Sequence, residues 1–187
     1  MEIRKFRTES QAVPSTKMQN PTEGVMSPNK LEDFVVEMLL ERLKDEYAAH
    51  YFYRASANWC RSKNYKKAAA FFDEESSSEL EHSKKVQNYL TDWNVDFQIP
   101  RAETEHEFES LINIINGAYQ MELSLLKAYN QTSSEVLVKD MTTFDFLQEL
   151  RQGQNQSVIE YSDLLNALNL VDYNDKFQIL YFEQTYF

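Results

Sequence analysis

The sequence predicts an all-α protein: a bundle of four long helices, a long crossover between the second and third, and a short fifth helix at the C-terminus. Two observations support this prediction. Among 187 residues there are only 3 glycines and 4 prolines, whereas a β-rich domain needs many turns built from these residues. Apolar side chains also recur at steps of three and four, which is the period of an α-helix. A chain of this length can form one domain with a full core.

We divide the chain into three parts by composition and period. Residues 1–28 are polar, contain three of the prolines and show no sustained period, so we expect a flexible N-terminal extension. Residues 29–170 carry the four long helical patterns and are expected to form the bundle. Residues 171–187 end in an apolar segment that we expect to form the short C-terminal helix.

The helix boundaries follow from breaks in the apolar period. Asn64 separates the first two patterns, and residues 93–104 contain Pro100 and no clear period, so we expect the long crossover there. A short turn is expected over residues 138–142. The expected helices cover residues 31–61, 65–92, 105–135 and 143–168, followed by the short helix over 177–187. Average globular helices have about 11 or 12 residues, so helices more than twice as long are expected to lie side by side.

Charge, the distribution of apolar residues and cysteine content exclude several classes of protein. The formal net charge is −11, so nucleic acid is not an expected partner, because phosphate binding needs a concentrated basic surface. No apolar run approaches the roughly 20 residues of a membrane span, and the N-terminus lacks the apolar centre of a secretory signal. The single cysteine, Cys60, excludes an internal disulfide framework and a cysteine zinc site. It fits a cytoplasmic location.

Each of the four apolar helix faces is interrupted near its middle by polar residues. They are Glu46 on the first helix, Glu79 and His82 on the second, Glu122 on the third and Gln154 on the fourth. A carboxylate that faces an apolar core is costly unless it is paired or bound to a cation. Because all four interruptions lie at a similar depth, we expect one metal site in the middle of the bundle.

The spacing of these residues agrees with a single site. Glu79 and His82 are three residues apart and share one helix face. The interval from Glu46 to Glu79 is 33 residues. The interval from Glu122 to Gln154 is 32, so two hairpins of similar length bring both pairs to one level. Di-iron bundles use one glutamate from each of two helices and Glu-x-x-His from the other two. The first hairpin has both the glutamate and the Glu-x-x-His of this pattern. In the second hairpin, Gln154 stands where the second Glu-x-x-His would begin.

Carboxylate oxygens together with one imidazole suit iron, and we expect Glu79 to bridge two metal ions. One ion is then held by Glu46, Glu79 and His82. The other is held by Glu79, Glu122 and Gln154, and the neutral amide of Gln154 is the weakest ligand. Because the second position is weak, we expect ferric product to be released rather than kept as a permanent di-iron centre.

Three other residues near these patterns are also candidates for a role. Tyr53 lies two turns from Glu46 on the same face, and two interpretations stay open for it. It either hydrogen-bonds the site or passes an electron to it, or it is an ordinary core tyrosine with a satisfied hydroxyl. His50, one turn from Glu46, is expected to be structural rather than a ligand. His106 is expected to begin the third helix, exposed to solvent.

At these residues the chain resembles the non-haem ferritins, both bacterial and animal heavy-chain types, over about residues 30–182. The matching stretches are Asp45-Glu46-Tyr47, Tyr53, Trp59-Cys60, Ala68–Phe72, Glu79–His82, Tyr119–Glu122, Phe144–Gln148, Gln154 and Leu180–Phe182. The resemblance implies that the chain oxidises Fe(II) with dioxygen or peroxide, and that 24 copies form a hollow shell that stores ferric mineral. It implies a ferroxidase centre made of Glu46, Glu79, His82, Glu122 and Gln154, with Tyr53 beside it.

The chain also departs from parts of this family. Leu80 stands where bacterioferritins carry the methionine that binds haem, so no haem is expected. The glutamates that form a third iron position in many bacterial ferritins are replaced here by Ser78, Gly153, Gln156 and Ser157. That third position is therefore expected to be missing.

Two alternative functions stay open at the level of the sequence. In the first, the chain keeps the di-iron site but forms no cage, and acts as a small oligomeric carboxylate oxidase or iron-loading protein. In the second, it is mainly a structural or interaction module, and the N-terminal extension is its working part. The size of the assembly separates the first alternative from a storage shell, and deletion of residues 1–28 tests the second.

Overall fold

A computed structural model describes residues 27–187, which contain five α-helices and no strand. The expected all-α bundle is thereby confirmed, and nearly all of the expected N-terminal extension lies outside the described residues. The helices are α1 (Asp33–Ser62), α2 (Lys66–Asp92), α3 (Leu111–Val136), α4 (Met141–Leu168) and α5 (Lys176–Tyr186). Four of the five helices begin and end within two residues of the predicted bounds.

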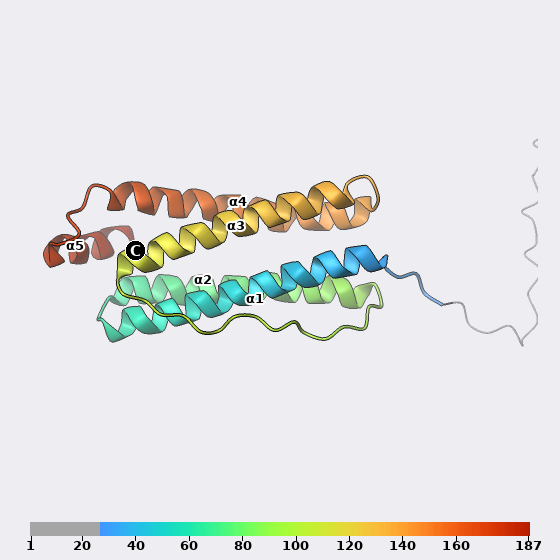
Figure 1. The fold of residues 1–187 in the computed structure, drawn as a ribbon, viewed down its shortest axis with the longest axis horizontal. Helices are drawn as coiled ribbons and strands as arrows, with labels where there is room; N and C mark the ends of the chain where they lie inside the picture. The colour runs from blue at the N-terminus through green and yellow to red at the C-terminus, as the bar shows by residue number, and fades with distance from the viewer. Residues whose placement is uncertain (1–26) are drawn as a thin grey trace, which may run out of the picture.

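The four long helices form two hairpins that lie against each other. The α1 helix packs along α2, α3 packs along α4, and the hairpins contact each other mainly through α1 and α3. Figure 1 shows the crossover running along the length of the bundle, so that α3 begins at the end of the bundle where α1 turns into α2. This connection brings the middle of all four helices to the same level.

The left-handed conformation of two asparagines ends the first two helices. Asn64 has a φ of 66° just after α1, and Asn94 has a φ of 57° just after α2. Asparagine tolerates this region better than other residues with a Cβ atom. The expected break at Asn64 is therefore the residue at which the chain reverses to form the first hairpin.

The predicted start of the third helix was wrong by six residues. Residues 105–110 belong to the crossover, and α3 begins at Leu111 because the Ser110 side chain accepts a hydrogen bond from the Asn113 backbone nitrogen at 3.0 Å. His106 was also expected to be exposed, but it is half-buried. Its ring lies edge-on to Phe52, with 5.4 Å between the ring centroids. Residues 105–110 are therefore held by aromatic packing and do not form part of a helix.

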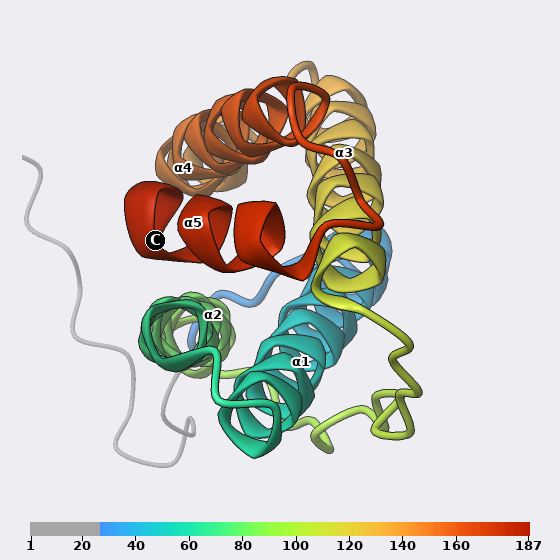
Figure 2. The same ribbon diagram turned by 90° about the vertical axis from the view of Figure 1, so that its left-hand side faces the viewer.

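The α5 helix lies across one end of the bundle, between the ends of α2 and α4 (Figure 2). The fully buried carboxylate of Glu183 accepts hydrogen bonds from the backbone nitrogens of Lys67 (2.7 Å) and Ala68 (3.1 Å). Tyr65, which precedes α2, makes no side-chain cap of its own. Glu183 therefore caps α2 from a distant part of the chain and attaches α5 to the bundle.

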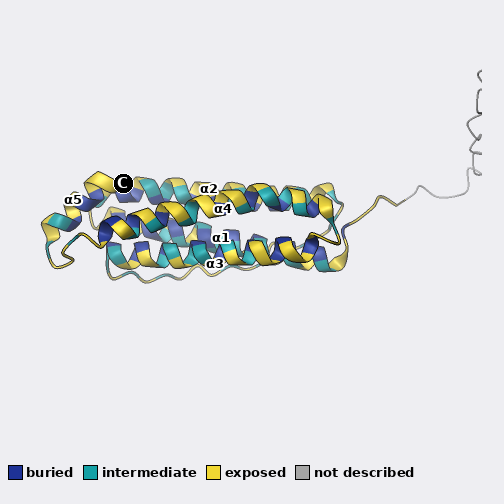
Figure 3. Cartoon of the chain, turned by 90° about the horizontal axis from the view of Figure 1, so that it is seen from above, coloured by how far each residue is buried: buried dark blue, intermediate teal, exposed yellow. Residues whose placement is uncertain are grey.

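Buried and exposed residues alternate along each long helix, and the buried ones face the bundle axis (Figure 3). The core consists of aliphatic side chains such as Leu39, Leu43 and Ile115, together with Phe72 and buried tyrosines. Over residues 27–187, none of the helices combines the length and apolar character that a membrane crossing requires. The polar residues in the middle of this core need a separate explanation.

Candidate metal centre

Five predicted site residues meet at one level in the middle of the bundle. Glu46 comes from α1, Glu79 and His82 from α2, Glu122 from α3 and Gln154 from α4. The glutamates and the glutamine expose 2 % of their surface or less. Three buried carboxylates around one imidazole are costly unless protons or a cation compensate their charge.

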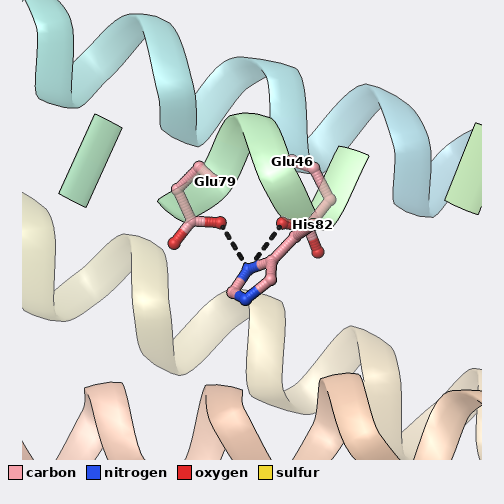
Figure 4. Close-up of side chains that lie close together, drawn as sticks. All are labelled: Glu46, Glu79 and His82. Carbon is pink, nitrogen blue, oxygen red and sulfur yellow. Dashed lines mark hydrogen bonds and ion pairs between the residues drawn. The ribbon is translucent and has the colours of Figure 1, made fainter. Parts of the chain in front are cut away.

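Three of these residues gather their ligand atoms closely. The Nδ1 atom of His82 lies 3.2 Å from Oε2 of Glu79 and 3.5 Å from Oε2 of Glu46 (Figure 4). One ligand atom from each of the three residues lies within 4.8 Å of the others. The Oε2 atom of Glu46 is buried and has no hydrogen-bond partner among the described residues. A cation bound here would satisfy that oxygen.

Glu122 is held by two hydrogen-bond donors instead of joining this cluster. The Tyr53 hydroxyl donates to Oε1 of Glu122, and the Gln154 side-chain amide donates to Oε2. The same amide also donates to the Glu122 backbone carbonyl at 3.2 Å. Gln154 thus presents its nitrogen to Glu122. The structure therefore places Glu122 and Gln154 beside the cluster of Glu46, Glu79 and His82 as a pair bonded to each other.

A second tyrosine mirrors the role of Tyr53, and sequence reasoning did not single it out. The Tyr129 hydroxyl on α3 donates to Oε1 of Glu46 on α1, while Tyr53 on α1 donates to Glu122 on α3. In both helices the tyrosine follows the glutamate by seven residues, which is two helical turns. The signal that could have revealed Tyr129 is this repeated Glu-x6-Tyr spacing. Each tyrosine orients the carboxylate of the other hairpin.

Burial and mutual charge shift the pKa values of these groups in opposite directions. Burial, reinforced by the negative charge of Glu46, raises the pKa of Glu79 well above its usual range. Burial also acts to raise the pKa of Glu46, but its interactions with the His82 ring and the Glu79 carboxyl outweigh burial and lower that pKa. Burial acts to lower the pKa of His82, yet Glu46 and Glu79 raise it to about 10.

The pKa of Glu122 is raised to about 7 by burial, against the opposing hydrogen bonds from Tyr53 and Gln154. At neutral pH the site without metal therefore holds a proton on His82, and the raised pKa of Glu79 favours the protonated form of its carboxyl. A divalent cation would replace those protons, because carboxylates and imidazole bind metals in their deprotonated forms. Two carboxylates with one imidazole nitrogen form a donor set that suits first-row transition metals.

His50 behaves as a structural histidine. Its Nδ1 atom lies 2.7 Å from the Ser76 carbonyl oxygen and 3.0 Å from the Ser76 hydroxyl. These contacts link α1 to α2 one turn away from Glu46. They engage the ring nitrogen that faces α2, and His50 does not belong to the group of ligand atoms around His82.

The chain is similar in sequence to a known protein family and to proteins of several bacteria. The family model of the Ferritin-like domain matches residues 36–171. The bacterial non-heme ferritin of Campylobacter jejuni is 29 % identical over 140 residues, which cover 73 % of this chain and 83 % of that protein. The bacterial non-heme ferritin of Escherichia coli O157:H7 is 25 % identical over 145 residues, covering 75 % of this chain and 86 % of that protein.

Solved structures show the same fold. An open pore ferritin from Archaeoglobus fulgidus superposes with a TM-score of 0.75 at 20 % identity, covering 84 % of this chain and 98 % of that one. A ferritin of Chlorobium tepidum superposes with a TM-score of 0.73 at 24 % identity, covering 81 % of this chain and 93 % of that one. The resemblance stated from the sequence motifs is confirmed by these matches.

Proposed function

This chain belongs to the ferritin-like family, and we propose that it is a ferroxidase and iron-storage protein. It oxidises Fe(II) to Fe(III) in the middle of the bundle and deposits the ferric product inside an oligomeric shell. The observation that carries this proposal is the cluster of Glu46, Glu79 and His82, in which a buried Glu46 oxygen faces the His82 ring but has no hydrogen-bond partner among the described residues. The names of the bacterial relatives, which are non-heme ferritins, support the same activity.

Iron is the substrate of this site. The first Fe(II) binds to Glu46, Glu79 and His82, where it displaces the protons that the site holds without metal. The second binds between Glu79 and Glu122, next to Gln154. The carboxylates neutralise the positive charge that increases as Fe(II) becomes Fe(III), and dioxygen or peroxide accepts the electrons. Tyr53 and Tyr129 keep the outer carboxylates in the orientation that binding requires.

The two positions differ in strength, and this difference supports turnover. The first has two carboxylates and an imidazole within 4.8 Å of one another. The second depends on Glu122, which is already hydrogen-bonded to Tyr53 and Gln154. Iron at the second position is therefore held more weakly, and ferric product can leave for storage. With Leu80 in place of a haem ligand, we propose a protein without haem.

The assembly that we propose is a shell of 24 copies in the cytoplasm. The support for it is the family itself together with the superposition on ferritin structures. The short α5 helix is folded onto the end of the bundle by Glu183, which gives that end of the molecule a defined surface for contacts between copies. The single buried cysteine agrees with a reducing compartment.

Aerobic titration of the iron-free protein with Fe(II), followed by absorbance and then by sizing of the product, tests this proposal. We expect fast oxidation that continues far beyond two irons per chain, in a shell-sized particle. Oxidation that stops at about two irons per chain in a small particle would instead indicate a di-iron oxidase without a cage. Absence of oxidation would contradict the proposal. His50→Ala is a matched control for His82→Ala, because it removes a half-buried histidine outside the cluster.

A further inference from the structure

A groove between α3 and α4 is lined by none of the proposed iron ligands. It has a volume of about 460 Å³. Two residues of α3 and three of α4 form its walls: Leu126, Asn130, Arg151, Gln152 and Asn155. Four of these five carry a guanidinium or an amide, which donate hydrogen bonds, and none of the five carries a carboxylate. The groove therefore suits a ligand that is rich in hydrogen-bond acceptors.

The arginine of this groove differs from the other arginines of the long helices. Arg42, Arg54 and Arg61 each pair with an aspartate. Arg151 is half-buried, and its hydrogen-bond partner is the neutral Gln148, whose Oε1 accepts from Nη2. Its Nε atom is buried and has no partner among the described residues. A buried N–H group without an acceptor is costly, so this guanidinium lacks an acceptor that a ligand could supply.

The shape of the guanidinium indicates which ligand fits. Nε and Nη2 lie on one edge of the group, and their N–H bonds point in parallel directions. A carboxylate or phosphate offers two oxygens at the matching spacing and accepts from both atoms at once. The single amide oxygen of Gln148 meets only Nη2 of Arg151. An oxyanion that takes the place of this amide oxygen would satisfy both nitrogens and pair the positive charge.

The charge of the two groove walls favours an anion as well. The chain has 30 acidic residues, yet residues 123–134 of α3 and residues 150–159 of α4 contain none. The charged residues of these two segments are Lys127 and Arg151, and both are basic. In a chain with a formal net charge of −11, these facing segments are therefore a local region of positive charge. A small anion is attracted to such a region.

We propose that the groove between α3 and α4 binds a small oxyanion, either phosphate or a small polycarboxylate. Arg151 holds two of its oxygens, and the amides of Asn130, Gln152 and Asn155 donate to the others. Since one water takes about 30 Å³ in the liquid, a groove of about 460 Å³ has room for such an anion together with bridging waters. This binding is independent of iron oxidation, because no proposed iron ligand takes part in it.

The first test is isothermal titration of the full-length, iron-free protein with inorganic phosphate and, separately, with citrate at the same ionic strength. We expect saturable binding, and the anion that binds more tightly identifies the source of the oxygens. Arg151→Gln should weaken it about tenfold or more, because hydrogen bonds to a charged group are lost.

Arg42→Gln is the matched control, since Arg42 is also half-buried but already pairs with Asp45; it should bind like wild type. The proposal is overturned if wild type binds neither anion, or if Arg151→Gln binds as tightly as wild type.

The second test locates the anion in the groove. Asn155→Asp places a carboxylate of nearly the same size there, which repels an oxyanion and offers Arg151 an internal partner. We expect it to lose the rise in Tm that phosphate gives wild type. Asn116→Asp makes the same change at an exposed position of α3, about four turns before Asn130, and should keep that rise.

Sizing checks that both variants assemble like wild type. An equal rise in Tm for Asn155→Asp and Asn116→Asp would contradict the groove as the binding site. Failure of wild type to oxidise Fe(II) would instead contradict the proposed function, so the two failures are distinguishable.

Discussion

The two helical hairpins meet at the same level but present different chemistry to the centre. The α1–α2 hairpin supplies Glu46, Glu79 and His82, and one Glu46 oxygen has no hydrogen-bond partner among the described residues. The α3–α4 hairpin supplies Glu122 and Gln154, which are hydrogen-bonded to each other. Each hairpin carries a glutamate followed seven residues later by a tyrosine. We therefore propose that equivalent positions in one fold give one strong and one weak binding position, because only α2 carries Glu-x-x-His.

The largest effect should follow from removal of ligands in the first hairpin. Loss of even an outer-shell partner typically lowers metal affinity or activity about 10- to 100-fold. We therefore expect His82→Ala to slow initial Fe(II) oxidation by more than about 100-fold, as measured by stopped-flow absorbance. His50→Ala should oxidise Fe(II) at nearly the wild-type rate. Circular dichroism should show that both variants stay helical. Equal oxidation rates in His82→Ala and His50→Ala would contradict the assignment of His82 as an iron ligand.

Glu122 of the second hairpin should contribute to the pH dependence of stability in the iron-free protein. The pKa of Glu122 is raised from 4.5 to about 7, so between these values the folded state holds a proton that the unfolded chain has lost. The free energy of unfolding should therefore fall as pH rises through this range, by roughly 2–3 kcal/mol. Thermal melts of wild type and Glu122→Gln check this. Glu75 and Glu79, whose pKa values are also raised, keep part of the slope in both proteins. A slope in Glu122→Gln equal to that of wild type would contradict the role of Glu122.

Restoring the missing ligands should make the two hairpins alike. The double variant Gln154→Glu with Ser157→His gives α4 the Glu-x-x-His of α2. We expect it to hold its second iron between about 10- and 100-fold more tightly and to release ferric product more slowly. Iron retained after gel filtration in the presence of a chelator measures this. Retention equal to that of Ser157→His alone would show that the charge of residue 154 does not limit release.

The reciprocal tyrosines offer a finer comparison between the hairpins. Tyr129→Phe removes the donor to Glu46, and Tyr53→Phe removes the donor to Glu122. We expect each to weaken Fe(II) binding about tenfold, Tyr129→Phe at the first position and Tyr53→Phe at the second. Isothermal titration under anaerobic conditions resolves the two positions. If both variants weakened the same position, the crossed arrangement would not describe the protein in solution.

The smallest effect concerns two glycines in helix interiors, one on each helix of the second hairpin. A Cβ atom added at Gly153 on α4 would meet nothing within 4 Å, whereas at Gly117 on α3 it would lie 3.1 Å from the Phe52 ring. Gly153→Ala should therefore raise the free energy of unfolding by about 1 kcal/mol, and Gly117→Ala by less. Denaturant melts compare the two. A destabilised Gly153→Ala would show that α4 uses the flexibility of glycine beside Gln154.

Much of the architecture could be predicted from the sequence because helical period is a local property. Steps of three and four located four of the five helices within two residues. They also placed Glu46, Glu79, Glu122 and Gln154 on inward faces, where the structure buries them. Similar hairpin lengths predicted that these residues meet at one level. The third helix was the exception, because its predicted first turn lies in aromatic contacts with Phe52 instead.

Only the tertiary structure decided which of these inward residues bond to each other. The pairing of Tyr129 with Glu46, and of Gln154 with Glu122, depends on how far one helix is rotated and shifted relative to another. The capping of α2 by Glu183 likewise joins residues more than 100 positions apart. A residue's helix face follows from its neighbours in sequence, but its hydrogen-bond partner follows from the packing of whole helices. The sequence by itself therefore determined the bundle and the level of its polar centre, and helix packing decided which residues of that centre bond to each other.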